Sequence, residues 1–243
     1  MEYKGPSAYD NEQFLDNFLA RRNREESPNN TMEHPAFMKF LGDVSQRKIL
    51  DLGCGDAQFG VELLEQGCAS YEGVEGSSKM TDQARSTLGQ LKGKVFHSSM
   101  EDWDYPHDHY DVIISRVSFH YIEKLQPVFK KIHQSLRENG RFVFSVQHPV
   151  LTSSQVSAEQ SSKKFNWVVD NYFECEKRVE PWINEKVVKY HRTFEEYFRL
   201  VKGAGFKIDD VSECTPRRDN FNSEEEYERR KRIPLFLIFA CQK

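Results

Sequence analysis

The sequence of 243 residues lacks the features of exported, membrane-spanning and metal-stabilised proteins. Its five cysteines are widely spaced and form no C-x-x-C pair, which disfavours a disulfide framework or a zinc site. No apolar run approaches the roughly 20 residues that cross a bilayer, and the N-terminus MEYKGP has no signal-peptide pattern. We therefore expect a cytoplasmic protein with reduced thiols, no membrane association and no metal.

Basic residues are not in excess either. Lys and Arg number 34 against 38 Asp and Glu, a net charge of −4, which argues against a dedicated nucleic-acid binder. The 13 glycines and 9 prolines are too few for a collagen-like or low-complexity chain. Aromatic residues are abundant at 13%. The length predicts one large domain, or one domain with a small cap.

Short apolar runs alternate with helical patterns from residue 46 onward. This pattern predicts strands at 48–52, 71–75, 94–97, 110–117, 141–146, 206–212 and 235–241, with helices at 59–66, 77–88, 125–140 and 193–203. Such alternation implies parallel crossovers and a doubly wound α/β sheet. A further helix opening at Ser223 is highly charged, and we expect it to be solvated, because each base has an acid one turn away.

Two segments depart from this alternation. Residues 1–45 are polar and aromatic with short helical patterns, and residues 148–192 form an insertion in which 168–190 could pair as a hairpin. A structureless loop of that length is uncommon in a compact domain. We therefore expect an N-terminal helical cap segment (1–45) and a main domain (46–243) whose insertion at about 148–192 also belongs to the cap.

The turn after the first strand of the main domain carries the clearest chemical signal. In Asp51-Leu-Gly53-Cys54-Gly55-Asp-Ala57 the glycines allow close backbone approach to a ligand. The third glycine of the dinucleotide fingerprint is absent, and Asp51 would repel a pyrophosphate but could pair with a cation. Glu75 ends the second strand, where a carboxylate accepts ribose hydroxyls. Together these features predict a nucleoside-containing ligand.

The segments ILDLGCGDAQFGVELLEQG, YEGVEGSSKM and YDVIISRVSFHYIEKLQPVFKKIHQSLRENGRFVFSV resemble class I S-adenosylmethionine-dependent methyltransferases. The resemblance covers roughly residues 45–147 and the closing elements from 193 to 241. Within that class the chain is most similar to the bacterial type 11 small-molecule methyltransferases, through FSVQHP, KYHRTFEEY and ESPNN…EHPAF. It implies a Rossmann-like, mostly parallel seven-strand sheet with an antiparallel last strand and helices on both faces.

The resemblance also implies roles for particular residues. Asp51, with the backbone at Gly53, Cys54 and Gly55, would hold the methionine part of S-adenosylmethionine, and Glu75 would take the ribose hydroxyls. The remaining residues expected around the cofactor are Gly76, Ser77, Met100, Glu101, Ser115 and Arg116. Ser99 stands where an acidic residue is common in the family, and Ala57 replaces a common third glycine, which a helix start should tolerate. The product would be S-adenosylhomocysteine.

The implied reaction is in-line displacement of a methyl group, in which the protein positions the acceptor and removes its proton. Three histidines follow strand ends or the insertion, where the fold places catalysis: His148 and His191, ranked first, and His120. Each could instead serve a structural role. No metal-ligand spacing occurs among the eight histidines.

We expect the acceptor to be a small molecule, planar or apolar, bound beneath the cap. The aromatic residues expected to line its pocket, or else to form the cap's own core, are Tyr9, Phe14, Phe18, Trp167, Tyr172, Trp182 and Tyr190. Arg21 and Arg22 could pair with an acceptor carboxylate. The protein could be a monomer or a homodimer. Three alternatives stay open: a nicotinamide-dependent oxidoreductase, a nucleic-acid methyltransferase, and a non-catalytic cofactor-binding protein.

Overall fold

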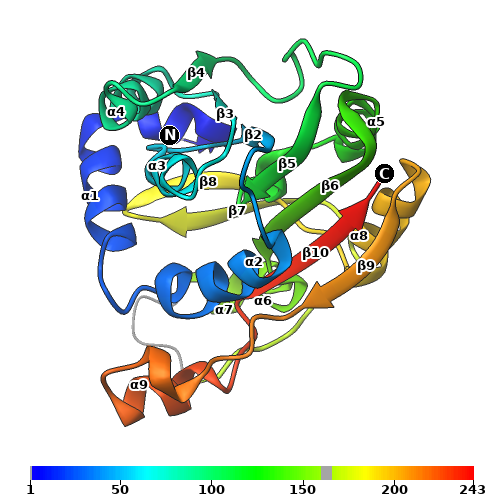
Figure 1. Cartoon of the computed structure of the whole chain (residues 1–243). Helices are drawn as coiled ribbons and strands as arrows, with labels where there is room; N and C mark the ends of the chain where they lie inside the picture. Colours follow the sequence, from blue (N-terminus) through cyan, green and yellow to red (C-terminus); the bar gives the residue numbers. More distant parts are fainter. Residues whose placement is uncertain (1, 160–165) are drawn as a thin grey trace.

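A seven-stranded sheet forms the centre of the protein in a computed structural model, which describes residues 2–159 and 166–243 (Figure 1). Its strands lie in the order β4-β3-β2-β5-β6-β10-β9. Their bounds are β2 (Lys48–Leu52), β3 (Ser70–Glu75), β4 (Gly93–His97), β5 (Tyr110–Arg116), β6 (Leu136–Gln147), β9 (Lys207–Ser212) and β10 (Phe236–Gln242). The strands from β4 to β6 pair in parallel, and β10 is antiparallel to both β6 and β9. The predicted doubly wound sheet is confirmed.

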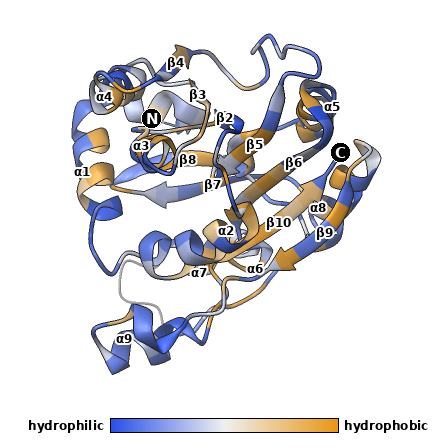
Figure 2. Cartoon of the chain, viewed as in Figure 1, coloured by the Kyte–Doolittle hydropathy of each residue, from blue (hydrophilic) through white to orange (hydrophobic). Residues whose placement is uncertain are grey.

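Helices cover both faces of this sheet, because its central strands are apolar on both sides (Figure 2). In β2, Ile49 packs into one face and Leu50 into the other. The first face is covered by α2 (His34–Leu41), α3 (Gln58–Glu65) and α4 (Ser78–Leu88), and the second by α5 (Leu125–Ser135) and α8 (Phe194–Gly203). Among the described residues, no helix is long and apolar enough to cross a membrane.

The boundary between α5 and β6 differs from the prediction. The apolar spacing predicted a helix to residue 140, but α5 ends at Ser135 and β6 begins at Leu136. Leu136 is fully buried and pairs with Tyr110 of β5, ahead of an irregularity that brings Arg141 opposite Val112. Tertiary pairing with β5 therefore ends the helix one turn early.

A second, three-stranded sheet joins the N-terminus to the insertion. β7 (Lys177–Trp182) and β8 (Glu185–Tyr190) form a hairpin, as predicted but shorter. Its two turn residues, Ile183 and Asn184, both have positive φ, as a two-residue hairpin turn requires. β1 (Glu2–Lys4) pairs in parallel with β8, which the sequence analysis did not predict, because three residues carry too short a pattern.

The remaining elements surround the carboxyl ends of the central strands. They are the 3₁₀ turns η1 (Gly5–Asp10), η3 (Phe119–Tyr121) and η4 (Arg218–Asn220), the π-helical turn η2 (Asn29–Glu33), and helices α1 (Glu12–Arg22), α6 (Pro149–Ser153), α7 (Gln155–Glu159) and α9 (Glu224–Arg230). Residues 160–165 of the predicted insertion lie outside the described residues. α1, η2 and α9 come from opposite ends of the chain and lie at one side of the molecule (Figure 1).

Candidate functional site

A cavity of about 410 Å³ lies where β2, β3, β5 and β6 end, beneath the N-terminal segment. Of the residues predicted to hold the cofactor, nine line it: Asp51, Gly53, Cys54, Gly55, Glu75, Gly76, Met100, Glu101 and Arg116. Ser77 and Ser115 do not. Ser115 is fully buried and donates a hydrogen bond to the carbonyl oxygen of Leu52, so it fixes the neighbouring strand instead.

The turn between β2 and α3 is shaped by its glycines. Gly53 has a φ of 73° and Gly55 a φ of 59°, a conformation that suits glycine. A Cβ on Gly53 would lie 2.5 Å from Oγ of Ser118, whereas one on Gly55 would meet nothing within 4 Å. Ala57 also has a positive φ, 57°, so the alanine that replaces the common third glycine stands in a left-handed conformation, with strain the sequence analysis did not expect.

Asp51 is buried at the floor of the cavity. The hydroxyl of Tyr71 donates a 2.9 Å hydrogen bond to Oδ2, while Oδ1 is buried with no partner among the described residues. Burial raises the pKa of the carboxyl to about 6. A buried hydrogen-bond acceptor without a partner destabilises the free protein. A ligand that brings a cation or a hydrogen-bond donor to this oxygen therefore gains binding free energy.

Glu75 stands at the end of β3, with both carboxylate oxygens turned to backbone donors. Oε2 accepts from the amide of Gly55 at 3.1 Å, and Oε1 accepts from the amide of Ser77 at 2.9 Å. Burial raises its pKa to about 7. Each oxygen keeps a lone pair for a further donor such as a ribose hydroxyl, and Glu75 also links the first glycine turn to the start of α4.

The N-terminal segment closes over this end of the cavity. A Cβ on Gly76 would lie 2.4 Å from Pro6, so the absence of a side chain lets Pro6 pack directly on the chain. Oδ1 of Asp10 accepts from Oγ of Ser77 at 2.8 Å and from the amide of Lys79 at 3.3 Å. Asp10 thereby caps α4, and Ser77 belongs to this cap rather than to the cavity wall.

Cys54, Met100 and Glu101 complete the cofactor side of the cavity. Burial raises the pKa of Cys54 well above its usual range, so the thiol stays protonated and packs as an apolar group. Met100 is buried against the core, and its carbonyl oxygen accepts from the hydroxyl of Tyr105 at 2.9 Å. Among the described residues no three His, Cys, Asp or Glu side chains form a metal-binding group.

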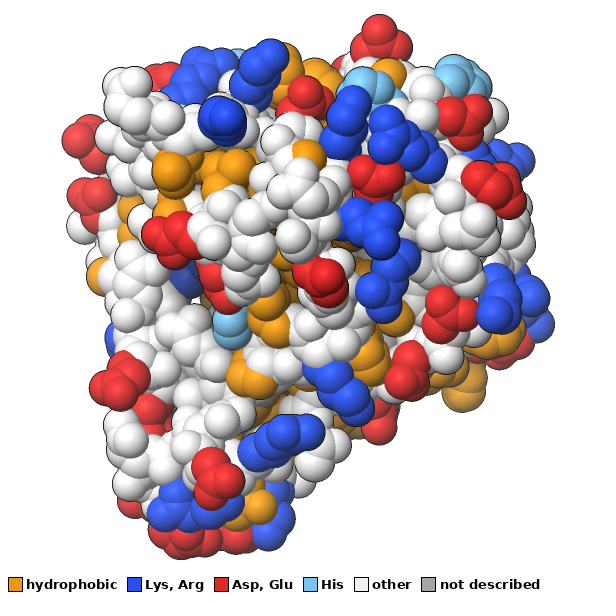
Figure 3. Space-filling model, viewed as in Figure 1, with side chains coloured by type: hydrophobic (Ala, Val, Ile, Leu, Met, Phe, Trp, Pro, Cys, Tyr) orange, Lys and Arg blue, Asp and Glu red, His pale blue; other side chains and the backbone are white. Residues whose placement is uncertain are grey.

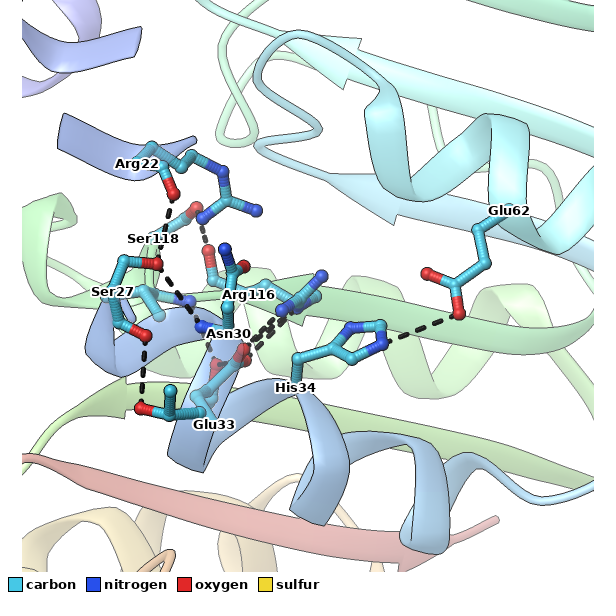
Figure 4. A network of polar contacts seen from close by, with 11 residues as sticks. Arg22, Ser27, Asn30, Glu33, His34, Glu62, Arg116 and Ser118 are labelled. Carbon is cyan, nitrogen blue, oxygen red and sulfur yellow. Dashed lines mark hydrogen bonds and ion pairs between the residues drawn. The ribbon is translucent and has the colours of Figure 1, made fainter. Parts of the chain in front are cut away.

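Arg116 belongs to a buried polar network that crosses the floor of the site (Figure 4). Its Nε donates to both oxygens of Glu33 at 3.1 and 3.2 Å, and Nη2 makes a further short contact with Oε2. The guanidinium carbon lies 4.3 Å from the ring centroid of Phe59. Burial opposes ionisation of Glu33, but the charge of Arg116 lowers its pKa below the usual value. Arg116 is thus already neutralised, by a partner the sequence analysis missed.

None of the three histidines predicted as bases lines the cavity. His120 is fully buried, and neither of its ring nitrogens has a hydrogen-bond partner in the described part of the chain. Burial lowers its pKa well below the usual range. Its ring packs against Tyr121, with centroids 4.2 Å apart, and it is Tyr121 that faces the cavity.

His148 and His191 have both ring nitrogens engaged. Nδ1 of His148 accepts from the amide of Val150 and caps α6, while Nε2 lies 2.9 Å from Glu213. Nδ1 of His191 lies 2.7 Å from Oγ1 of Thr152, and Nε2 lies 2.8 Å from the carbonyl oxygen of Tyr172. The expectation that these histidines reach the acceptor therefore has no support from the geometry. His191 joins two parts of the insertion, and His148 joins the start of the insertion to Glu213, after β9.

The residues predicted to line an acceptor pocket are only partly found in the cavity wall. Tyr9, Phe18 and Trp182 line it, as do Arg21 and Arg22. Phe14 is buried in a small core with Ile183 and Val187, which is the alternative role foreseen for the cap's aromatic residues. The other three predicted aromatic residues, Trp167, Tyr172 and Tyr190, are absent from the lining.

The polar lining residues that were not predicted include Arg24, Asp56, Gln147 and Arg230. Arg230 was missed because α9 looks like a solvated helix from its charge pairs. Gln147, the last residue of β6, lines the cavity, whereas the predicted His148 follows it and does not. The face in Figure 3 shows Lys and Arg interspersed with Asp and Glu, including over α9.

The residues present suit S-adenosylmethionine. The orphaned oxygen of Asp51 and the ionisable Glu75 offer acceptors for an ammonium group and for ribose hydroxyls. Gly55 leaves open space at the turn between them. Arg116 is the weakest of the predicted contacts, since Glu33 already occupies its guanidinium.

Comparison with known proteins supports the methyltransferase family and S-adenosylmethionine as the cofactor. Residues 9–211 match the family model described as methyltransferase domain. An uncharacterised protein of Haemophilus influenzae is 32% identical over 217 residues, which cover 85% of each chain. A solved S-adenosylmethionine dependent methyltransferase of Mesorhizobium loti is 28% identical, with a TM-score of 0.79 over 87% of this chain and 97% of that one. A Listeria monocytogenes protein assigned to the same enzymes is 30% identical, also with a TM-score of 0.79, over 87% and 96%.

Proposed function

From the premise that this chain belongs to the methyltransferase domain family and uses S-adenosylmethionine, we propose that it methylates a small-molecule acceptor. The observation that carries the proposal is that two sets of residues line one and the same cavity. Cofactor-side carboxylates Asp51 and Glu75 and acceptor-side residues Tyr9 and Trp182 face the same space of about 410 Å³. That volume lies within the ordinary range of small-molecule sites.

The N-terminal segment and the β7–β8 hairpin act as the acceptor cap in this proposal. β1 pairs with β8, and η1 packs on Gly76 through Pro6, so two distant parts of the chain cover one opening. A cavity covered by the chain's own segments favours a small acceptor over an extended macromolecule. With S-adenosylmethionine as cofactor, the nicotinamide alternative has no role.

The cofactor supplies a methyl group on a sulfonium centre, and the acceptor attacks it in line. Asp51 and Glu75 orient the donor by binding its polar ends, and the cap excludes water and fixes the acceptor in contact distance. The proposal assigns no proton transfer to His148, His191 or His120, because their ring nitrogens are engaged or buried away from the cavity. An acceptor that is already an anion, such as a carboxylate, needs no base.

Calorimetric titration with S-adenosylhomocysteine, followed by methyl transfer from methyl-labelled S-adenosylmethionine, tests the proposal. The acceptor source is a bacterial extract divided into dialysable and retained fractions. We expect label to enter the dialysable fraction, and Glu75→Ala to abolish both binding and transfer. Label confined to the retained fraction would contradict a small-molecule acceptor. Intact binding with no transfer to either fraction would favour the non-catalytic alternative.

A further inference from the structure

Arginines gather on one wall of the cavity. Arg21 and Arg22 end α1, Arg24 follows it, and Arg230 ends α9, and all four line the same space as Asp51 and Glu75. Surface arginines are common, so lining alone carries no inference. The pairing of each guanidinium decides which of them has binding capacity left.

Arg22 has that capacity. It is half-buried, and its guanidinium makes no hydrogen bond or ion pair with residues 2–159 or 166–243; only its carbonyl oxygen is used, by Ser27. Figure 4 shows its guanidinium near Ser118, while the guanidinium of Arg116 is turned toward Glu33. Burial and the charge of Arg116 lower the pKa of Arg22. Asp56 attracts it from beyond ion-pair distance. The neighbouring Arg116, by contrast, is fully paired with Glu33.

Arg230 is incompletely satisfied as well. Its Nη2 lies 2.7 Å from Glu226, but Arg229 contacts the same carboxylate, so two cations share one anion. The Nε of Arg230 is buried without a partner among the described residues. The charge of nearby Arg24 acts on Arg230 in the same sense as burial, lowering its pKa.

The two halves of the cavity therefore carry opposite charge. Asp51 and Glu75 lie at the ends of β2 and β3 and Asp56 on the turn after β2, whereas the free guanidinium capacity lies on α1 and α9. Arg22 and Asp51 line the same cavity, and the charge of Arg22 opposes the effect of burial on the pKa of Asp51. A guanidinium that is partly desolvated and unpaired is poised for a carboxylate or phosphate, with which it can form two parallel hydrogen bonds.

We propose that the acceptor presents an oxyanion, a carboxylate or a phosphate, to Arg22 and Arg230. This inference rests on the proposed methyltransferase function and narrows its substrate class. It accords with a cavity wall that offers no histidine base, because an acid presented as its anion can itself be the nucleophile.

The experiment uses the full chain saturated with S-adenosylhomocysteine, titrated calorimetrically at constant ionic strength with malonate and with inorganic phosphate as probes. We expect at least one probe to bind. Arg22→Gln and Arg230→Gln should each weaken it by about tenfold or more, the loss expected for a charge-assisted hydrogen bond. The control Arg199→Gln removes an exposed arginine outside the cavity and should change nothing. Binding of neither probe by the unmodified protein, or unchanged affinity in either of the two cavity variants, would overturn the proposal.

A second arm separates the acceptor from the carboxylate of the cofactor itself. S-adenosylhomocysteine carries that carboxylate, and 5′-methylthioadenosine lacks it. We expect Arg22→Gln to change the affinity for both nucleosides equally little. A loss confined to S-adenosylhomocysteine would assign Arg22 to the cofactor and overturn its role toward the acceptor. If the unmodified protein binds neither nucleoside, it is the proposed function that fails.

Discussion

Tyr71 holds Asp51 by one oxygen and leaves the other free. The hydroxyl donates to Oδ2 at 2.9 Å, and Oδ1 is buried without a partner among the described residues. The ring reaches this position because Gly60 of α3 has no side chain; a Cβ there would lie 2.4 Å from Cζ of Tyr71. Gly60, two positions late for a dinucleotide fingerprint, thus serves to orient the carboxylate.

We predict that Asp51→Asn abolishes binding of S-adenosylhomocysteine and stabilises the free protein at neutral pH. The carboxyl has a pKa raised to about 6 by burial, so its ionised form is disfavoured in the folded state. A neutral amide of the same shape avoids that cost, worth roughly 3 kcal/mol at most. Calorimetry measures the affinity, and urea unfolding at pH ~7.5 measures the stability.

Tyr71→Phe is the matched control for this prediction, because it removes the hydrogen bond and keeps the charge. It should lower the stability of the free protein at the same pH, since a buried carboxylate oxygen loses its donor. If Asp51→Asn instead destabilised the free protein, the carboxylate would be a structural group.

Asp51 and Glu75 should lower the stability of the free protein as pH rises from about 4 to about 7, in opposition to His120, His148 and His191, whose lowered pKa values act in the other direction. Burial raises the pKa of Asp51 to about 6 and that of Glu75 to about 7. At these two carboxyl groups the folded state therefore binds more protons than the unfolded state in that pH window. The free energy of unfolding falls as these protons are released. Affinity for S-adenosylhomocysteine should change in the opposite direction, because its ammonium group needs an ionised Asp51.

Urea unfolding across this pH window measures the change in stability, and calorimetry measures the opposite change in affinity. The double variant Asp51→Asn, Glu75→Gln has neither titrating group, so the decline in stability that these carboxylates cause should vanish in it. An unchanged decline in the variant would mean that other groups cause it.

The two glycines of the first turn should respond differently to alanine. Both have positive φ, so each substitution carries strain of about 1–2 kcal/mol. At Gly53 the new Cβ would also lie 2.5 Å from Ser118 and 2.6 Å from Met100, so Gly53→Ala should destabilise the fold more. Gly55→Ala meets open space and should remain folded, yet bind S-adenosylhomocysteine more weakly.

Thermal unfolding and calorimetry of both variants check this difference. Equal loss of stability in the two would show that Ser118 and Met100 move aside. Full retention of affinity in Gly55→Ala would place the cofactor away from this turn.

Breaking the buried pair of Glu33 and Arg116 should cost about 3–5 kcal/mol. Arg116→Met leaves Glu33 buried with only Ser145, whose hydroxyl donates to Oε1 at 2.7 Å. The double variant Glu33→Gln, Arg116→Met should recover most of the loss, because no charge stays unpaired. The exposed pair of Glu12 and Lys79 supplies the control: Glu12→Gln should change the free energy of unfolding by at most about 1 kcal/mol.

Urea midpoints at unchanged slope measure these differences. A double variant as unstable as Arg116→Met would mean that packing of the guanidinium on Phe59, and not its charge, provides the stability.

Local pattern was enough to predict the sheet. Runs such as residues 48–52 and 110–117 are mostly apolar on both alternating faces, as expected for a strand covered on both sides. The glycine turn and the acidic strand end were predictable for the same reason, since backbone conformation and position on a parallel strand are encoded in a few adjacent residues. The pairing of β1 with β8 was not predictable, because it joins residues 2–4 to residues 186–188.

The sequence by itself determined the fold class, the cofactor and two carboxylates that line the cavity, Asp51 and Glu75, since these depend on local backbone and strand order. Only the tertiary structure decided the roles of the histidines, the pairing of Arg116 with Glu33 and the charge of the acceptor wall. A side chain's protonation and free hydrogen-bonding capacity depend on burial and on partners distant in the chain, such as α1 and α9. Residue spacing and composition do not predict which of those distant side chains come into contact.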